Sequence, residues 1–377
     1  MLIYLGLSAV ATWVAALAML LAADPSPPAI AHLVFAVGIM PLIFGAITHF
    51  VPVLTRSAGA HRAVLLAPLL LQLAAALAFL AFTGELPAAT VPAAAAAALL
   101  IATLFAGWLL LRARRTLGRP HPGWRWYLTA IVFLCLALLL VPAIHWWPEA
   151  RQELRLLHLH LNVLGLVGMT ALGTLQVLLP TVLSGPDADA AKRLRSDLAV
   201  AAGGVLLVSS GAAFSPPLAL LGALMLFSVA FKTALAWWLR YGWKTLLLNA
   251  AAAPLAGALA AFLLLLAFGV AHALAVLDGR DAIAAFVVGF LLPLVTGALT
   301  QLLPVWCCPG RGTATRARMH AALRSGGVWR TLLLVLAGVL LGLGIKAAIW
   351  LAAAAMLSFV IALLQSLPSI GKKDGAG

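Results

Sequence analysis

Long apolar stretches follow one another along the 377-residue chain, each bounded by proline, glycine or charged residues. Runs such as AFLLLLAFGV do not alternate apolar and polar positions, as a strand of a membrane β-barrel would. About 20 consecutive apolar residues suffice to cross a bilayer as a helix. The pattern therefore predicts an all-α polytopic membrane protein with twelve spans, at residues 2–23, 29–54, 63–83, 91–111, 126–146, 156–183, 198–214, 217–239, 245–272, 282–306, 329–345 and 347–367.

The composition supports this class. Hydrophobic residues make up 64% of the chain and charged residues 9%, which excludes an ordinary soluble domain and a disordered chain. A net charge of +14 would suggest nucleic acid as the partner of a soluble protein, but here it indicates basic cytoplasmic loops. We therefore expect membrane lipids around the protein and no nucleic acid. The first apolar run lacks a basic segment before it, which favours a retained span over a signal peptide.

The loop charges predict the orientation. If the N-terminus is cytoplasmic, the outer loops carry only Arg151, Arg155, Arg280 and Lys346, and Lys232 lies within a span. Such an asymmetry predicts that both termini are cytoplasmic, in an inner membrane of the bacterial type. The inner side then carries Arg56, Arg62, Arg112, Arg114, Arg115, Arg119, Arg125, Lys192, Arg193, Arg195, Arg240, Lys244, Arg311, Arg316, Arg318, Arg324, Arg330, Lys372 and Lys373.

A sequence element recurs at the end of the second, sixth and tenth spans. GAITHFVPVL (45–54), GTLQVLLPTV (173–182) and GALTQLLPVW (297–306) share a glycine and a proline seven residues later. A period of four spans predicts three four-helix units related by pseudo-threefold symmetry. The expected units are residues 1–125, 126–244 and 245–377.

The histidines are the candidate ligands. When the repeats are aligned on their glycine and proline, His32 falls at the position of His160, whereas the third copy has Ala284. Both histidines open a span on the outer side, so we expect them at one depth, with the iron of a single haem between them. His158 lies about 200° from His160 around a helix. It is therefore expected to contact a haem propionate, to make a hydrogen bond or to bind a second metal.

The other histidines are weaker candidates. His145 and His272 end the fifth and ninth spans on the outer side and could join the site, but no spacing connects them to it. His49 lies about 25 Å deeper than His32 on the same helix, and its expected role is in a polar cap with Thr48, Gln176, Thr300 and Gln301. The remaining three lie in basic loops and are expected to be solvated: His61, His121 and His320.

Several kinds of site are missing from the sequence. All ten acidic residues fall in predicted loops or helix ends, so no proton relay across the bilayer is expected. Cys135, Cys307 and Cys308 form neither a disulfide framework nor a CxxC metal motif. The segment from Gly338 to Gly342 is a GxxxG motif, which favours close helix packing and could also serve a homodimer.

The span count, the four-helix repeats, His32 and HLHLNVLG at 158–165 resemble subunit I of the heme-copper oxidases, a family that includes nitric oxide reductases. The chain also looks similar to NnrS-type heme-copper membrane proteins. The resemblance implies that His32 ligates a low-spin haem. The family's second haem ligand and its copper ligands are histidines of the tenth and seventh spans, but neither 282–306 nor 198–214 contains one. Copper is therefore doubtful, and a terminal oxidase is not expected.

Two functions follow as expectations. The first is a haem b protein, with His32 and His160 as iron ligands, that serves electron transfer or a respiratory or nitric-oxide-related role with a redox partner protein. The alternative is a cofactor-free transporter or assembly factor, which could handle copper, with the histidines lining a polar cavity.

Overall fold

The computed structural model describes residues 1–22, 25–116, 118–185, 187–310 and 314–367. These residues form helices joined by short loops, and no strand occurs among them. Within this described part of the chain, twelve helices are long and apolar enough to cross a membrane, which confirms the predicted number. The protein is therefore a multi-pass membrane protein of the all-α class.

The contacts within the chain divide it into two compact units, which we call unit 1 (residues 1–174 and 188–222) and unit 2 (residues 175–187 and 223–377). Two helices contribute to both units: α8 (Met169–Val182) and α10 (Pro216–Tyr241). Each unit is described separately.

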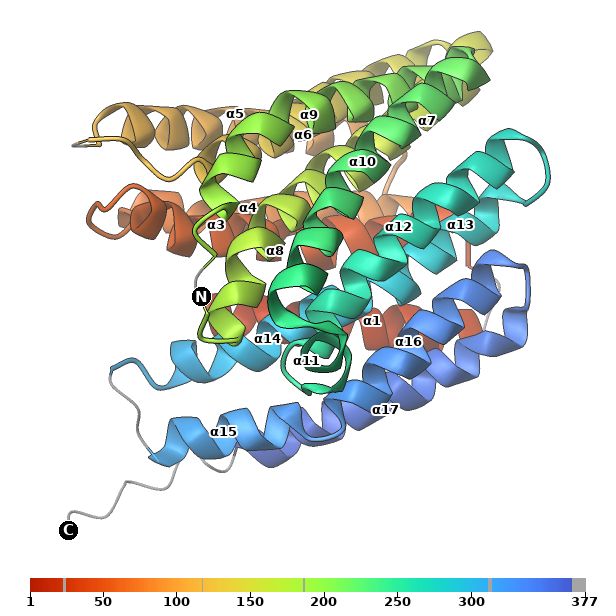
Figure 1. Cartoon of the computed structure of the whole chain (residues 1–377). Helices are drawn as coiled ribbons and strands as arrows, with labels where there is room; N and C mark the ends of the chain where they lie inside the picture. Colours follow the sequence, from red (N-terminus) through yellow and green to blue (C-terminus); the bar gives the residue numbers. More distant parts are fainter. Residues whose placement is uncertain (23–24, 117, 186, 311–313, 368–377) are drawn as a thin grey trace. The chain divides into compact units, whose positions relative to one another are not determined.

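Unit 1 holds the N-terminal helices. Here α1 packs against η1 and α3, and α4 packs against η1, α3 and α5. Helix α6 lies beside α5 and α9 (Figure 1). The elements are α1 (Leu2–Ala22), α2 (Pro27–Ala31), η1 (His32–Ile39), α3 (Met40–Leu54), α4 (Arg62–Phe82), α5 (Thr90–Arg114), α6 (Gly123–Trp146), η2 (Pro148–Ala150), α7 (Arg151–His160), η3 (Leu161–Gly168) and α9 (Ala190–Phe214).

Unit 2 holds the C-terminal helices. Helix α12 packs against α14, α16 and η4, and α16 runs beside α17 (Figure 1). The elements are α11 (Trp243–Leu248), α12 (Ala253–Ala273), α13 (Gly279–Ala285), η4 (Phe286–Leu291), α14 (Leu292–Cys307), α15 (Ala314–Arg324), α16 (Gly327–Gly342), η5 (Lys346–Ala348) and α17 (Ile349–Ser366).

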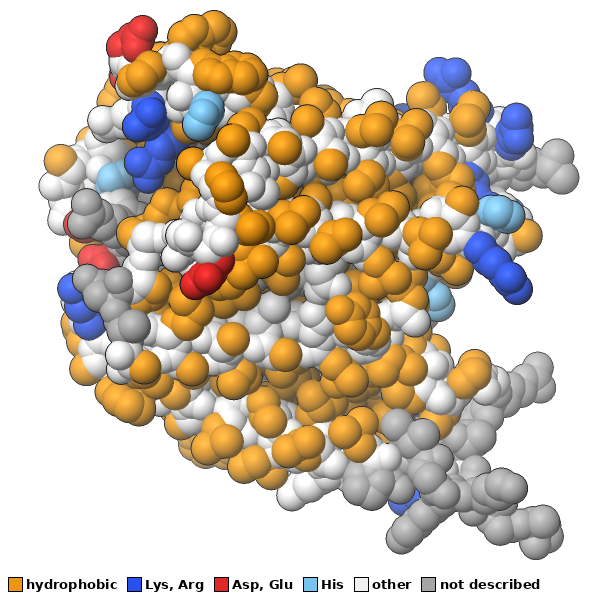
Figure 2. Space-filling view, turned by 180° about the vertical axis from the view of Figure 1, so that it is seen from behind, with side chains coloured by type: hydrophobic (Ala, Val, Ile, Leu, Met, Phe, Trp, Pro, Cys, Tyr) orange, Lys and Arg blue, Asp and Glu red, His pale blue; other side chains and the backbone are white. Residues whose placement is uncertain are grey.

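The helices carry apolar side chains on their outer faces as well. Figure 2 shows one face that hydrophobic side chains largely cover, with most of the charged side chains toward its left and right edges. One exposed stripe follows α10 at intervals of three and four residues, which places its members on one side of the helix. Such a stripe is expected to contact lipid chains. It consists of Leu224, Phe227, Phe231, Leu235 and Trp238.

Among the residues with a described structure, three spans contain a π-helical segment, in which an N–H group bonds the carbonyl five residues before it. The segments η1, η3 and η4 lie in the second, sixth and tenth spans, and each ends five or six residues before the glycine of the repeat. Proline explains two of them. Pro41 and Pro293 follow η1 and η4 at the same spacing, and a proline has no N–H for the α-helical bond to the residue four before it.

The glycines of the repeat allow close packing against an earlier helix. A Cβ at Gly45 would lie 2.5 Å from Leu5 of α1, and one at Gly173 would lie 2.7 Å from Trp126 of α6. A Cβ at Gly297 would lie 2.8 Å from Pro254 of α12. In each case the helix that is contacted is the first span of one predicted four-helix unit.

The ninth and eleventh spans begin elsewhere than predicted. The ninth was expected from residue 245, but α11 ends at Leu248 and α12 starts at Ala253. The side chain of Asn249 explains the break, because its Oδ1 accepts from Ala251 N at 2.9 Å and from Ala252 N at 3.3 Å. The eleventh was expected from residue 329, but helix α15 precedes α16 and is separated from it by a turn.

Arg330 stabilises the turn between α15 and α16. Gly326 adopts a left-handed conformation with φ of 70°, which ends α15 as glycine commonly does. The guanidinium of Arg330, whose residue is only 6% exposed, donates to the carbonyls of Leu323 (2.6 Å) and Ser325. It also lies 5.6 Å from the ring centre of Phe359. One buried cation thus satisfies carbonyls that the end of α15 leaves without helical partners.

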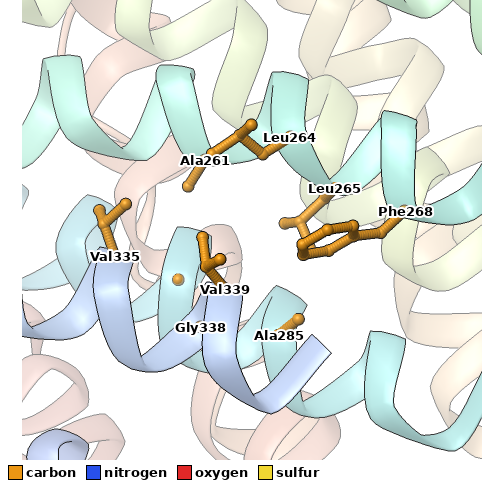
Figure 3. A pocket seen from close by; sticks show the side chains of 9 residues that line it. Ala261, Leu264, Leu265, Phe268, Ala285, Val335, Gly338 and Val339 are labelled. Carbon is orange, nitrogen blue, oxygen red and sulfur yellow. The ribbon is translucent and has the colours of Figure 1, made fainter. Parts of the chain in front are cut away.

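The GxxxG motif packs inside unit 2. A Cβ at Gly338 would collide with Gly289 of η4, and one at Gly342 would lie 2.7 Å from Phe268. Beside this crossing lies a small apolar hollow whose walls come from α12, α13, η4 and α16 (Figure 3). These glycines therefore serve contacts within the chain. The hollow is lined by Ala261, Leu264, Leu265, Phe268, Ala285, Gly289, Val335, Gly338 and Val339.

The expectation that all acidic residues lie in loops or helix ends is wrong for Asp197. Helix α9 begins eight residues earlier than the predicted span, at Ala190, and Asp197 is buried within it. Ser196 donates to its Oδ1 at 2.7 Å. The charges at its N-terminal end made this stretch look like a loop, although it continues the helix.

Candidate functional site

His32 lies where a short α-helix passes into a π-helical segment. Pro27 and Pro28 occupy the first turn of α2, where a proline costs no helical hydrogen bond. His32 follows α2 directly and is the first residue of η1. The change in helical pitch therefore begins at the residue that the sequence singled out as a ligand.

The structure brings His158 to His32. The two ring centroids are 6.5 Å apart and the ring planes differ by 17°. His158 lies on α7, three residues before η3 begins. Two imidazoles from different spans, each next to a π-helical segment, thus face each other within unit 1.

Backbone carbonyls fix the tautomer of both rings. Nδ1 of His32 lies 2.7 Å from the carbonyl of Pro28, and Nδ1 of His158 lies 2.9 Å from that of Ala137 on α6. A carbonyl oxygen can only accept, so each Nδ1 carries the proton. Each Nε2 then keeps a free lone pair, which is the form in which imidazole binds a metal.

The separation of the rings suits one metal ion between them. If both Nε2 atoms pointed at a shared ion, two metal–nitrogen bonds of about 2.0 Å, plus about 1.15 Å from each nitrogen to its ring centre, would place the centroids about 6.3 Å apart. The observed 6.5 Å agrees with this value. The ring of Phe82, at the end of α4, lies 4.4 Å from that of His32 and provides an apolar wall.

Among the residues that the structure describes, no three His, Cys, Asp or Glu side chains gather as a metal site. The protein therefore offers two donors here. Two imidazoles suit an iron whose other four ligands come from a porphyrin. They also suit a metal ion of low coordination number.

His160 is the partner of His32 that the sequence repeat predicted. Its Nδ1 lies 2.8 Å from the carbonyl of Leu156, four residues earlier. His32 makes the same contact with Pro28, so the aligned histidines share their local geometry. The ring that faces His32, however, is that of His158, which the sequence alone had assigned to a propionate, a hydrogen bond or a second metal.

The remaining outer histidines contact neighbouring groups. The ring of His145 lies 6.3 Å from that of Trp146, and Nδ1 of His272 lies 3.1 Å from the carbonyl of Leu277. His272 belongs to unit 2, whereas His32 and His158 belong to unit 1. His49 lies in α3, with its ring 5.4 Å from that of Phe50.

Of the three loop histidines, only His61 is exposed as expected. It precedes α4 and accepts from Ala63 N at 3.3 Å. His121 is half-buried, and burial lowers its pKa, with a further contribution from the positive charge of Arg195. His320 lies on α15 and is also half-buried, because α15 packs against α14 and α17.

Asn162 completes the HLHLN segment. Its side-chain amide donates to the carbonyl of His158 at 2.8 Å. This bond holds the turn in which α7 passes into η3 and keeps the backbone of His158 in place.

Comparison with known proteins provides no assignment: no family model matches the chain, and no curated protein is significantly similar to it.

Proposed function

We propose that the chain is an integral membrane haem-binding protein in which His32 and His158 ligate the iron of one haem b. The observation that carries the proposal is the pair of nearly parallel imidazoles with both Nδ1 atoms bonded to carbonyls. His160 was the partner expected from the repeat, and the facing rings favour His158 instead. Haem would supply one-electron redox chemistry at this position.

The residues of the site have distinct tasks in this proposal. His32 and His158 bind through Nε2, while the carbonyls of Pro28 and Ala137 hold the two rings at fixed angles. Phe82 excludes water from one side of His32. If both imidazoles bound the iron of a haem, no coordination position would be left for a substrate, which favours electron transfer to a redox partner, in a respiratory or nitric-oxide-related role, over gas reduction.

The proposal includes the finer architecture. The three π-helical segments at equivalent positions, and the three repeat glycines that each pack on a first span, support three four-helix units with pseudo-threefold symmetry. The charge asymmetry of the loops supports an inner membrane location of the bacterial type, with both termini cytoplasmic.

Reporter fusions test this orientation. Because of the charge asymmetry of the loops, fusions after Arg125 and Lys192 are expected to report the cytoplasm, and fusions near Glu85, Glu153 and Asp278 the outer side. An odd error in the span count would invert some of these results. An enzymatic reporter active on only one side of the membrane gives the readout. A fusion near Glu153 that reports the cytoplasm would contradict the orientation at the candidate haem site itself.

The spacing of the rings also fits a second candidate, a copper-handling assembly factor or transporter without haem. Two neutral imidazoles can bind a single copper ion in a linear arrangement, and no third protein ligand is needed. This candidate predicts copper without porphyrin in the purified protein.

The absorption spectrum and metal content of protein purified from its native membrane distinguish the two. Haem binding predicts a Soret band, sharp α and β bands after reduction, and about one iron per chain, since two axial imidazoles make the iron low-spin. Copper in a comparable amount with no Soret band would instead support the copper-handling protein. Protein with neither metal, after expression with ample haem and copper, would contradict both.

A further inference from the structure

The side chain of Gln72 joins three helices inside unit 1. Gln72 lies on α4, and its amide Nε2 donates to Ser8 Oγ of α1 at 2.6 Å and to the carbonyl of Val37 in η1 at 3.2 Å. In an apolar environment such a polar side chain is costly unless it is hydrogen-bonded. One of these bonds ends at Val37, five residues after the candidate haem ligand His32 and in the same π-helical segment.

The carbonyl of Val37 lacks its α-helical donor. In an α-helix it would accept from the N–H of residue 41, but residue 41 is proline. The next N–H before it, that of Met40, bonds the carbonyl of Phe35 five residues back, as in a π-helix. Gln72 therefore provides a donor at the position where Pro41 cannot.

The π-helical segment determines the direction in which His32 points. Adding or removing one residue in a helical turn rotates everything before it by about 100° around the axis. If η1 became an α-helix while α3 stayed in place, His32 would turn away from His158. The hydrogen bond of Gln72 to Val37 is made by the π-helical form described here.

We propose that Gln72 is a positioning residue, which together with Pro41 keeps η1 π-helical and so holds the His32 imidazole opposite that of His158. The proposal rests on the proposed function only for the identity of the bound group. The arrangement of the two helices can be tested with or without haem.

The first experiment replaces Gln72 by methionine, which has a similar length and no amide. Gln72→Met is expected to convert the low-spin haem spectrum to a largely high-spin one, with altered electron paramagnetic resonance, because His32 no longer reaches the iron. The matched control is Gln365→Met, at an exposed position on α17, which is expected to keep the low-spin spectrum. A wild-type spectrum in folded Gln72→Met would overturn the proposal.

The second experiment does not need a cofactor. In the double variant His32→Cys/His158→Cys, a short bifunctional methanethiosulfonate is expected to cross-link the two cysteines rapidly. Adding Gln72→Met is expected to slow this reaction about tenfold, as a displaced reactive pair would. An unchanged rate in folded protein would overturn the proposal even if the wild type proves to lack haem.

Pro41→Ala provides a second variant in case Gln72→Met does not fold. It restores the N–H that Val37 lacks and lets η1 become α-helical with Gln72 still present. The same slowing of the cross-link, and the same spectral change, are expected. If the cross-link forms at the original rate in Pro41→Ala, the π-helical segment does not control the direction of His32, and the proposal fails.

Discussion

Alanine in place of His158 is expected to abolish the low-spin haem spectrum, whereas alanine in place of His160 is expected to leave it in place. His158 presents its ring to His32, at 6.5 Å between centroids, and six-coordinate iron needs two imidazoles. His32→Ala should have the same effect as His158→Ala. Absorption and electron paramagnetic resonance spectra of the purified variants provide the measurement, together with the haem content per chain.

The adjacent histidine makes this test sharp. His158 and His160 lie on one helix, two residues apart, so their alanine variants differ little in helix propensity or in the number of histidines. Added imidazole is expected to restore a low-spin spectrum to His158→Ala, since it can occupy the vacated axial position. If His160→Ala loses the spectrum and His158→Ala keeps it, the pair aligned by the repeat, His32 and His160, ligates the iron instead.

Leucine in place of Arg330 is expected to destabilise the protein by about 3 kcal/mol, the usual order for losing buried hydrogen bonds to a charged group. The substitution leaves the carbonyls of Leu323 and Ser325 without their donors at the end of α15. Arg330→Lys should recover only part of the loss, because a single ammonium cannot reproduce the planar fork of the guanidinium. Unfolding in mixed micelles, followed by circular dichroism, measures the effect.

Arg62→Leu is the matched control for charge. Arg62 begins α4 and is exposed, so its loss should change the free energy of unfolding by less than about 0.5 kcal/mol. Equal stability of Arg330→Leu and Arg62→Leu would show that water or lipid headgroups satisfy the carbonyls at the turn, and that Arg330 is not needed there.

Hydropathy predicted the helical class and the number of spans because each span must be long and apolar, and a single sequence carries that information directly. The breaks within apolar stretches were not predictable in the same way. Asn249 looked like an isolated polar residue inside a span, and only its bonds to Ala251 and Ala252 show that it starts a new helix. Arg330 looked like a loop charge, although it is buried against the end of α15.

The sequence also identified the helices that carry the candidate ligands, but chose a different histidine on the second one. Alignment of the repeat makes His160 the equivalent of His32 in the next unit. Each of the two rings bonds the carbonyl four residues before it, which agrees with that alignment. Which of two residues about 200° apart faces a neighbouring span depends on how the helices are rotated. The π-helical segments change that rotation, and no hydrophobic pattern records it.

Gln72 was missed for a related reason. Gln72 is the only polar residue in a long apolar run of the sequence. Its structural role depends on hydrogen bonds to Ser8 and Val37, which are far away in the sequence. The available signal was Pro41, whose missing N–H leaves a carbonyl in need of a donor. A polar residue in a neighbouring span at the matching depth would then have been a candidate partner.

The partners of the two Nδ1 atoms bear on the reduction potential of an iron bound here. Both rings donate to uncharged backbone carbonyls, those of Pro28 and Ala137, and not to carboxylates. A carboxylate partner would push electron density onto the ring and stabilise ferric iron, which carries one positive charge more than ferrous iron. Without such a partner, and in an apolar environment that disfavours the extra charge, the ferrous form is stabilised relative to the ferric form. The site would therefore take up an electron more readily than a bis-histidine haem whose rings are held by aspartate or glutamate.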